Sequence, residues 1–396
     1  MKDGWQTKTL GEVCDLDKCQ GIHKNLPYVG LEQIESHTGR FIGSIEPLEV
    51  KSSTFKFSRE HVLYGRLRPY LNKVMLPDFT GHCSTEIFPL KPRPGLSREF
   101  LQYWFLRDAT VERIDATSTG ARMPRANMNA VLSFDFPLPP LPEQHQIVSI
   151  LDEAFEGIAT AKANAEKNVQ NARALFESHL QSVFTERGAD WDRLTLDSLL
   201  KRGWIESHLD GNHGSDYPRK AEFIGEGIPY ISANCLDNES VDMTRAKYLS
   251  QSRAALIRKG VAKDNDVLFA HNATVGPVAI LHTDEEKVIL GTSLTYYRCN
   301  KNHILPEYLA HYMRSFGFKT QYLAVMGQST RNQVPITKQR EFYHVIPRLD
   351  EQKLIVSQLD GLLESIQRLE FIYQKKLAAL EALKKSLLHQ AFSGKV

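Results

Sequence analysis

The stretch Leu141-Pro-Glu-Gln-His-Gln-Ile-Val-Ser-Ile-Leu-Asp152 indicates how the chain is organised, because a close copy follows 208 residues later as Leu349-Asp-Glu-Gln-Lys-Leu-Ile-Val-Ser-Gln-Leu-Asp360. Eight of the twelve positions are identical in the two stretches. The same offset carries Phe184 onto Phe392, so both copies extend over more than forty residues. Such a repeat has to be recognised before the fold is predicted. It divides the chain into two half-proteins, roughly 1–187 and 188–396.

Each copy of the repeat has the periodicity of a long helix. Apolar residues recur at steps of three and four, which is the heptad pattern of a coiled-coil seam. The predicted seam contains Ile147, Leu151, Ile158, Asn168 and Leu175 in the first helix and Ile355, Leu359, Ile366, Tyr373, Lys376 and Leu380 in the second. Asn168 and Lys376 are polar and occupy the same position in the two copies. They are either a device that fixes the helix register or solvated irregularities.

Helix signals and turn residues set the predicted domain organisation. Prolines precede each helix, and Gly188 and Gly394 follow them. The rest of each half contains short apolar runs, such as 62–64 and 266–269, and helical stretches at 97–115 and 306–324. We therefore predict an α+β protein with a pseudo-twofold repeat, in which two long antiparallel helices form a coiled-coil spacer. Its parts are mixed α/β domains at 1–140 and 188–346, and helices at 141–187 and 347–396.

Composition indicates an ordinary globular chain. Of the 396 residues, 42% are apolar and 24% are charged, and no apolar run approaches the length of a membrane span. We expect a cytoplasmic protein with no membrane contact. The five cysteines are never spaced as CxxC, so buried thiols are the expectation. The net charge of +2 means that any nucleic-acid surface must be arranged locally.

Sequence motifs of catalysis and of metal binding are missing. The chain has no GxxxxGK[ST] phosphate loop and no HExxH pair. Cys14, Cys19 and His23 lack a fourth ligand at usable spacing for zinc. We therefore predict no catalytic residue, no metal and no cofactor in this chain.

Two windows of the sequence contain bases but no acids, between Asp115 and Asp135 and between Glu307 and Glu341. Each window also holds a Ser-Thr-x4-Pro stretch, at 118–124 and 329–335. Such loops are either solvated or suited to phosphates and base edges, which Arg, Asn, Gln, Ser and Thr contact. Together with the basic stretch 64–73 and its counterpart 269–274, they supply the DNA-binding candidates. These are Arg66, Arg68, Lys73, Ser118, Thr119, Arg122, Arg125, Asn127, His271, Asn272, Ser329, Thr330, Arg331, Asn332, Gln333 and Lys338.

The repeated motif resembles the specificity subunit of type I restriction-modification systems. The resemblance rests on Leu-Pro-Glu-Gln or Leu-Asp-Glu-Gln followed by Ile-Val and a long helix, and on the ending Gln390-Ala-Phe-Ser-Gly-Lys395. The opening Trp5-x-x-Lys-Thr-Leu-Gly-Glu-Val13 and the stretch Tyr64-Gly-Arg-Leu-Arg-Pro-Tyr-Leu-Asn-Lys73 also look like that family's target-recognition domains.

The resemblance implies a function for each part. Two target-recognition domains would each read one half of a bipartite sequence in double-stranded DNA. The helical spacer would dock two methyltransferase subunits, which carry S-adenosylmethionine, and restriction subunits would join them. One departure is that the second domain lacks an equivalent of Arg66 and Arg68.

Apolar residues outside the predicted seam are candidates for partner binding, because exposed apolar patches mark interfaces. We expect Val148, Phe155, Val356 and Leu363 to be exposed and to bind partner helices. Two alternatives remain open: a chain with its own methyltransferase activity, for which the motifs are missing, and a non-enzymatic scaffold whose globular domains bind protein.

Overall fold

The computed structural model describes residues 4–185, 190–212, 217–237, 239–327 and 332–395. The chain divides into two compact units. The first contains residues 1–167 and 373–396, and the second contains residues 168–372. Each unit therefore combines one globular domain with parts of both long helices, which are α5 (Leu141–Thr185) and α11 (Leu349–Phe392).

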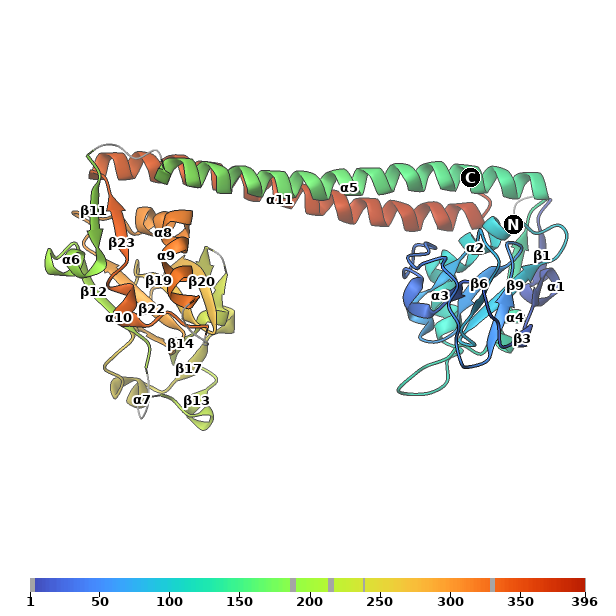
Figure 1. Cartoon of the computed structure of the whole chain (residues 1–396), viewed down its shortest axis with the longest axis horizontal. Coiled ribbons are helices and arrows are strands. Elements are labelled where there is room, and N and C mark those ends of the chain that lie inside the picture. Colours follow the sequence, from blue (N-terminus) through green and yellow to red (C-terminus); the bar gives the residue numbers. More distant parts are fainter. Residues whose placement is uncertain (1–3, 186–189, 213–216, 238, 328–331, 396) are drawn as a thin grey trace. The chain divides into compact units, whose positions relative to one another are not determined.

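The first domain is built on a sheet with strand order β2-β9-β6-β7 and a second sheet with order β3-β5-β8-β4 (Figure 1). The strands are β2 Cys14–Leu16, β9 Ile87–Pro92, β6 Val62–Gly65, β7 Val74–Met75, β3 Gln20–Gly21, β5 Thr54–Phe57, β8 Gly81–Cys83 and β4 Tyr28–Val29. The helices are α1 Leu10–Val13, α2 Arg98–Leu106, α3 Asp108–Asp115 and α4 Met128–Leu132, with short 3-10 turns η1 Leu31–Gln33 and η2 Pro69–Leu71. Pairing is antiparallel within the sheet that contains β6, and β4 runs parallel to β8 in the other one.

The second domain repeats the first of these sheets, but its other sheet has five strands in a different order. One sheet has the order β12-β22-β19-β20, and the other has the order β13-β17-β14-β21-β18, in which β14 runs parallel to β21. The strands are β12 Ile205–Asp210, β22 Leu294–Cys299, β19 Val267–Asn272, β20 Thr274–Ile280, β13 Phe223–Ile224, β17 Lys247–Leu249, β14 Ile228–Ile231, β21 Val288–Leu290 and β18 Val261–Ala262, with a hairpin of β15 Leu236–Asp237 and β16 Ser240–Val241. The helices are α6 Leu196–Lys201, α7 Gln251–Ala255, α8 Pro306–Arg314, α9 Phe316–Met326 and α10 Ile336–Gln339, with 3-10 turns η4 Lys220–Glu222, η5 Ala233–Cys235 and η6 Met243–Arg245.

Each predicted helical stretch inside a domain is broken in the same place. The stretch 97–115 divides at Arg107, and the stretch 306–324 divides at Ser315. Both residues have extended backbone angles, so they end one helix and begin the next. The break gives each domain two consecutive short helices, α2 and α3 in the first domain and α8 and α9 in the second.

Each domain is closed by a strand from its own N-terminal end. β1 (Gln6–Thr9) pairs antiparallel with β10 (Asp135–Leu138), the strand that leads into α5. In the second half, β11 (Asp192–Thr195) pairs in the same way with β23 (Tyr343–Ile346), which leads into α11. The first and last strands of each domain therefore lie together at the N-terminal end of the long helix that follows the domain.

The long helices pair antiparallel, as the sequence predicts. Figure 1 shows α5 (green) running beside α11 (red). In the first unit, Lys162 Nζ lies 2.9 Å from Glu381 Oε1. In the second unit, Arg173 forms an ion pair with Glu370. In both pairs α5 supplies the base and α11 the acid.

The predicted seam is correct except at Asn168, Leu175 and Lys376. Ile147, Leu151, Ile158, Ile355, Leu359 and Ile366 are buried. Asn168 and Lys376 are exposed, whereas the next residues, Val169 and Leu377, are partly buried. Leu175 is also exposed, and Tyr373 and Leu380 are partly buried. The predicted polar interruption of the seam is therefore absent from these described helices. The physical reason is that an α-helix drifts by about 20° per heptad from a strict 3.5-residue repeat.

The end of each long helix completes the core of the domain that belongs to the other half of the sequence. Phe184, near the end of α5, packs in the second domain with its ring centroid 5.4 Å from that of Tyr312. Phe392, at the end of α11, packs in the first domain, with its ring centroid 4.6 Å from that of Phe100. Neither domain is thus complete within its own half of the sequence.

Candidate DNA-contacting loops and partner surface

Two loops of the first domain lie side by side at the end of β6. The amide of Arg68 donates to the carbonyl of Pro124 at 2.7 Å, and the amide of Ala126 donates to the carbonyl of Arg66 at 2.9 Å. Thr119 and Arg125 exchange both backbone hydrogen bonds, which closes a hairpin. The structure therefore joins the basic stretch 64–73 with the acid-free window, which the sequence indicates only as separate segments.

The tip of this hairpin is exposed. Gly120 has a φ of +97°, a conformation that glycine adopts without strain. Arg122 is exposed and forms no ion pair with any residue that the structure describes, and Met123 beside it is also exposed. Arg68, on the neighbouring loop, is likewise exposed and has no acidic partner within the described part of the chain. These two guanidinium groups are therefore available to a ligand.

Arg66 and Arg125 are held by one carboxylate. Arg66 Nε lies 2.9 Å from Glu86 Oε2, and an Arg125 guanidinium nitrogen lies 2.9 Å from Glu86 Oε1. Burial by itself would raise the pKa of Glu86, but the hydrogen bonds from Arg125 and Arg66 outweigh burial and lower it. Glu86 comes from outside the acid-free window, so the local sequence overstated the positive charge of this loop.

The four remaining candidates in the first domain differ in their contacts and exposure. Lys73 Nζ donates to the carbonyls of Leu31 and Ile34 at 2.7 and 2.8 Å, so its ammonium is already engaged. Asn127 caps α4, with its side chain accepting from the amides of Asn129 and Ala130. Ser118 is partly buried, whereas Thr119 is exposed.

The second domain has the same arrangement of backbone. The amide of Ala273 donates to the carbonyl of Asn332 at 3.0 Å, and the amide of Val334 donates to the carbonyl of His271 at 2.8 Å. Ala273 and Arg68 both have positive φ, of 64° and 50°, which is uncommon for residues other than glycine. The two domains therefore build their paired loops on one backbone frame.

This frame corrects the alignment of the two windows. Arg125 bridges to Leu67, and Gln333 bridges to Asn272, so Arg125 corresponds to Gln333. The residues that precede α4 and α10 are Asn127 and Pro335, which therefore occupy equivalent cap positions. The prolines of the two Ser-Thr-x4-Pro stretches are therefore not equivalent in the structure, because Pro124 corresponds to Asn332 and not to Pro335.

The candidates of the second domain differ in accessibility. His271 is buried, and its Nδ1 contacts the carbonyl of Val334, so it cannot reach a base edge in this conformation. Asn272 and Gln333 are partly exposed, and Asn332 is exposed while donating its side-chain amide to the carbonyl of Ala273. Lys338 is paired with Glu341 at 3.0 Å. Ser329, Thr330 and Arg331 lie outside the described residues.

A buried hydrogen-bond network supports the second loop. Gln339 accepts from Thr295 and Tyr297 and contacts His208 Nε2, at 3.0 to 3.1 Å, and donates to the carbonyl of Val334. Burial lowers the pKa of His208 to about 4 and that of the neighbouring His344 also to about 4. Both side chains are therefore neutral at physiological pH.

These histidines predict acid sensitivity of the second domain. Between pH 6.5 and 4 the folded histidines bind fewer protons than the unfolded ones, so stability falls as the pH falls through 6.5. At pH 5 we expect a loss of about 2 kcal/mol per histidine. This loss of stability can be measured by amide hydrogen exchange of β19 and β22 at pH 7 and pH 5, corrected for intrinsic exchange rates. His344→Phe should reduce the dependence, and an unchanged pH dependence in that variant would contradict the prediction.

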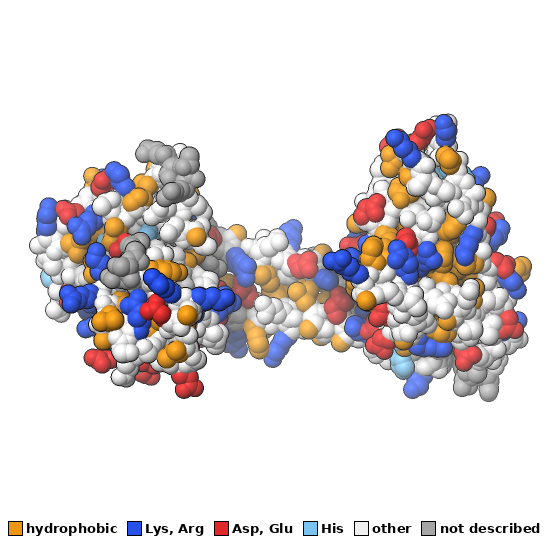
Figure 2. All heavy atoms as spheres, turned by 90° about the horizontal axis from the view of Figure 1, so that it is seen from below, with side chains coloured by type: hydrophobic (Ala, Val, Ile, Leu, Met, Phe, Trp, Pro, Cys, Tyr) orange, Lys and Arg blue, Asp and Glu red, His pale blue; other side chains and the backbone are white. Residues whose placement is uncertain are grey.

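Figure 2 shows Lys and Arg side chains (blue) distributed over both globular domains with acidic side chains among them. Basic and acidic side chains are therefore mixed on this face of both domains, in agreement with the net charge of +2. Among the described residues, no group of three or more His, Cys, Asp and Glu side chains is arranged to hold a metal ion. No helix of the described chain has both the length and the apolar character needed to cross a bilayer.

The four candidates for partner binding are not exposed as predicted. Val148 is buried in the core of the first domain, and the ring of Phe155 lies 5.5 Å from that of Tyr103. Val356 packs against the core of the second domain, and Leu363 lines a pocket beside it. The prediction that these side chains are exposed failed because the N-terminal part of each long helix packs against the domain that precedes it. The helices expose other apolar side chains, namely Ile150, Leu175, Leu354, Leu369, Phe371, Ile372 and Leu383.

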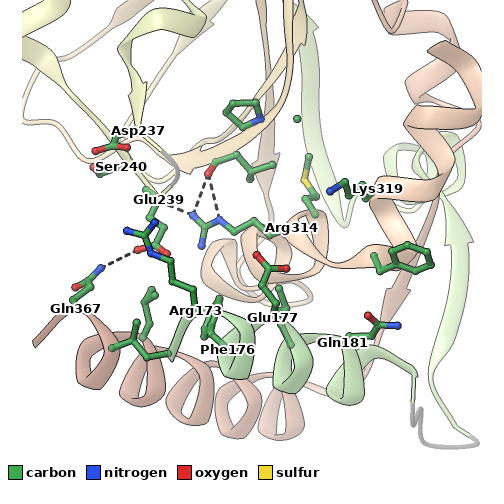
Figure 3. Close-up of a pocket in the computed structure, with 18 of the residues that line it drawn as sticks. Arg173, Phe176, Glu177, Gln181, Asp237, Glu239, Ser240, Arg314, Lys319 and Gln367 are labelled. Atoms are coloured by element: carbon green, nitrogen blue, oxygen red, sulfur yellow. Dashed lines mark hydrogen bonds between the residues drawn. The ribbon is translucent and has the colours of Figure 1, made fainter. Parts of the chain in front are cut away.

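The pocket that Leu363 lines has a volume of about 880 Å³ and lies in the second unit, where α5 and α11 meet the domain (Figure 3). Arg314 donates to the carbonyls of Val278 and Glu239, and Gln367 on α11 donates to the carboxylate of Glu239 at 2.9 Å. Burial lowers the pKa of Arg314. Arg314 belongs to the basic window of the sequence, but the structure places it against the helices and away from the loops.

Comparison of the sequence with known protein families identifies the family of this chain. The family model described as the type I restriction modification DNA specificity domain matches residues 2–170 and 212–380. The chain belongs to this family. The family model matches once in each half, in agreement with the 208-residue repeat.

Relatives of this specificity family agree with the assignment. The specificity subunit of the type I restriction enzyme EcoDI of Escherichia coli is 29% identical over 191 residues, which cover 47% of this chain and 42% of that protein. The specificity subunit of EcoBI, also from Escherichia coli, is 21% identical over 298 residues, covering 72% of this chain and 63% of that protein. The chain thus spans less than two thirds of the length of these curated relatives.

Two solved structures share the fold. A chain from a structure that addresses complex assembly and conformational transition of the type I R-M system has a TM-score of 0.82 at 22% identity, and the match covers 100% of this chain and 99% of that one. The HsdS subunit from Thermoanaerobacter tengcongensis has a TM-score of 0.64 at 22% identity, with 100% and 98% covered. These likenesses confirm the predicted architecture of two mixed domains joined by two long antiparallel helices.

Proposed function

We propose that this chain is the DNA sequence-specificity subunit of a type I restriction-modification complex and that its two domains each read one half of a bipartite target. The observation that carries the proposal is one backbone frame bearing two sets of side chains. At exposed or partly exposed positions of this frame, Arg68 and Arg125 in the first domain correspond to Ala273 and Gln333 in the second, because the amides of Arg68 and Ala273 donate to the equivalent carbonyls of Pro124 and Asn332. A constant frame with different side chains is what two different half-sites require.

The chain has no catalytic role of its own in this proposal. Its sequence lacks a phosphate loop and the motif of an adenine methyltransferase. Methyl transfer from S-adenosylmethionine and DNA cleavage would belong to methyltransferase and restriction subunits. The purified chain should therefore bind DNA without modifying it.

The helices support the docking of two partner copies. In the second unit an apolar groove between α5 and α11 is lined by Leu175, His179, Gln358 and Leu362. The positions 208 residues away hold Leu383, Leu387, Ile150 and Ala154, so the first unit presents a similar apolar surface. Repeated surfaces of this kind suit two identical methyltransferase subunits, one at each unit, with restriction subunits joining that core.

A negative charge introduced by substitution into these apolar surfaces should release the methyltransferase partner. We expect Leu175→Glu with Leu362→Glu to release one methyltransferase copy, and Leu383→Glu with Ile150→Glu to release the other, because a buried unpaired carboxylate opposes binding. Native mass spectrometry of complexes with the methyltransferase of the same host measures the number of copies. Leu256→Glu, at an exposed site in the second domain, is the control. Two copies retained by every variant would refute this docking site.

The function is tested by the adenine methylation pattern of the host with and without this gene. Loss of methylation at one bipartite sequence supports the proposal. An unchanged pattern, together with no salt-dependent binding of the chain and its partners to duplex DNA, would favour the scaffold alternative.

A further inference from the structure

Gln144, the glutamine of the first repeated motif, joins three segments of the first unit. Its Oε1 accepts from the amide of Ser97, at the start of α2, at 2.8 Å. Its Nε2 donates to the carbonyls of Gly95 and Pro139, both at 2.8 Å. The side chain is fully buried, and both amide hydrogens and the carbonyl are used.

Gln352 makes the same set of contacts in the second unit. Its Oε1 accepts from the amide of Leu305, at the start of α8, at 2.9 Å. Its Nε2 donates to the carbonyls of His303 and Pro347 at 2.8 and 2.9 Å. This side chain is also fully buried. The two glutamines therefore form the same three-way junction of domain, connecting segment and long helix.

A second contact lies eight residues further along each helix. The hydroxyl of Tyr103 on α2 donates to Asp152, and His311 Nε2 on α8 lies 2.7 Å from Asp360 Oδ1. Tyr103 and His311 are themselves 208 residues apart. Eight residues of helix span about 12 Å. Two attachment points at that distance fix the tilt of a domain on its helix, and the three separate hydrogen bonds of each glutamine restrict its rotation.

The short segments that connect each domain to its long helix do not by themselves fix the orientation of the domain. Only Pro139 and Pro140 lie between β10 and α5, and only Pro347 and Arg348 lie between β23 and α11. Proline fixes its own φ, so the remaining torsions of these short segments are the ones through which a domain could turn about its helix. The glutamine restricts this rotation in addition to the apolar packing of each helix on its domain, because it binds the carbonyl of the connecting proline and the adjoining domain loop together.

We propose that Gln144 and Gln352 are positioning residues that hold each recognition domain at one angle to its spacer helix, so that the protein accepts one separation of the two half-sites. The proposal rests on the proposed function, since it concerns how the bipartite target is measured. The glutamines act through the domains and touch no base.

The test is selection from random duplexes by the full chain with the methyltransferase of the same host. Gln144→Glu and Gln352→Glu keep the shape and the acceptor oxygen but remove the two donated hydrogen bonds. We expect both variants to keep the half-site sequences, to bind the original gap about tenfold more weakly, and to enrich gaps that are about one base pair longer or shorter.

Val131→Ala is the matched control, because Val131 is fully buried in the first domain but lies on α4, away from the junction. It should lower the stability of the domain and leave a single gap. A single unchanged gap in both glutamate variants, or equal broadening in Val131→Ala at the same loss of stability, would overturn the positioning role. If the unaltered chain selects no bipartite sequence at all, the proposed function fails instead.

Discussion

Phe392→Ala is expected to destabilise the first domain by about 3–5 kcal/mol, and Phe184→Ala the second domain by a similar amount, which is the usual cost of removing a buried phenyl ring. Both rings are almost fully buried, among residues of the domain that belongs to the opposite half of the sequence. A loss of this size is a large fraction of the stability of a domain. Each variant should therefore loosen one domain and spare the other.

Amide hydrogen exchange resolves the two domains in one experiment. With Phe392→Ala, protection should fall in β6 and β9, and with Phe184→Ala it should fall in β19 and β22. Leu383→Ala and Leu175→Ala are the controls, because these side chains are on the same helices but are exposed by 47% and 60%. A uniform loss of protection in both domains would show that the ends of the helices do not complete separate cores.

Arg68→Ala and Arg122→Ala are expected to weaken recognition of one half-site by about 1–3 kcal/mol for each base that the side chain no longer reads. Both guanidinium groups are exposed and form no ion pair with a described residue, whereas Arg66 and Arg125 already share Glu86. Gln333→Ala should weaken recognition of the other half-site, because Gln333 is partly exposed on the corresponding loop of the second domain and its side-chain amide can pair with an adenine edge.

Selection from random duplexes at two salt concentrations separates base recognition from phosphate binding. Loss of preference at one base supports a base contact, and an equal loss on all sequences with a flatter salt dependence indicates a phosphate contact. Arg93→Ala is the control, since Arg93 is paired with Asp15 and follows the end of β9 remote from Glu86. Full recognition by both arginine variants would refute the assignment of these loops.

The repeat, the two long helices and their antiparallel pairing could be predicted from the sequence. Helix periodicity is a local property of the chain, and the second copy of the motif supplied an independent check of the first. The same local counting failed for Asn168 and Lys376, because a strict heptad count drifts around a helix of more than forty residues. The absence of catalytic motifs was also readable, since such motifs are short and contiguous.

Which of the candidate side chains can contact a ligand became clear from the three-dimensional contacts alone. Glu86 reaches Arg125 from 39 residues away, and Lys73 is held by carbonyls 39 and 42 residues away. The contacts of Gln144 and Gln352 also could not be predicted from the sequence, although both residues belong to the repeated motif. Phe184 and Phe392 pack into domains from the other half of the chain, which no local pattern reveals. The repeat and its helices and strands could be read from the sequence because they depend on neighbouring residues. Whether a side chain can contact a ligand depends instead on contacts between residues that are far apart in the chain.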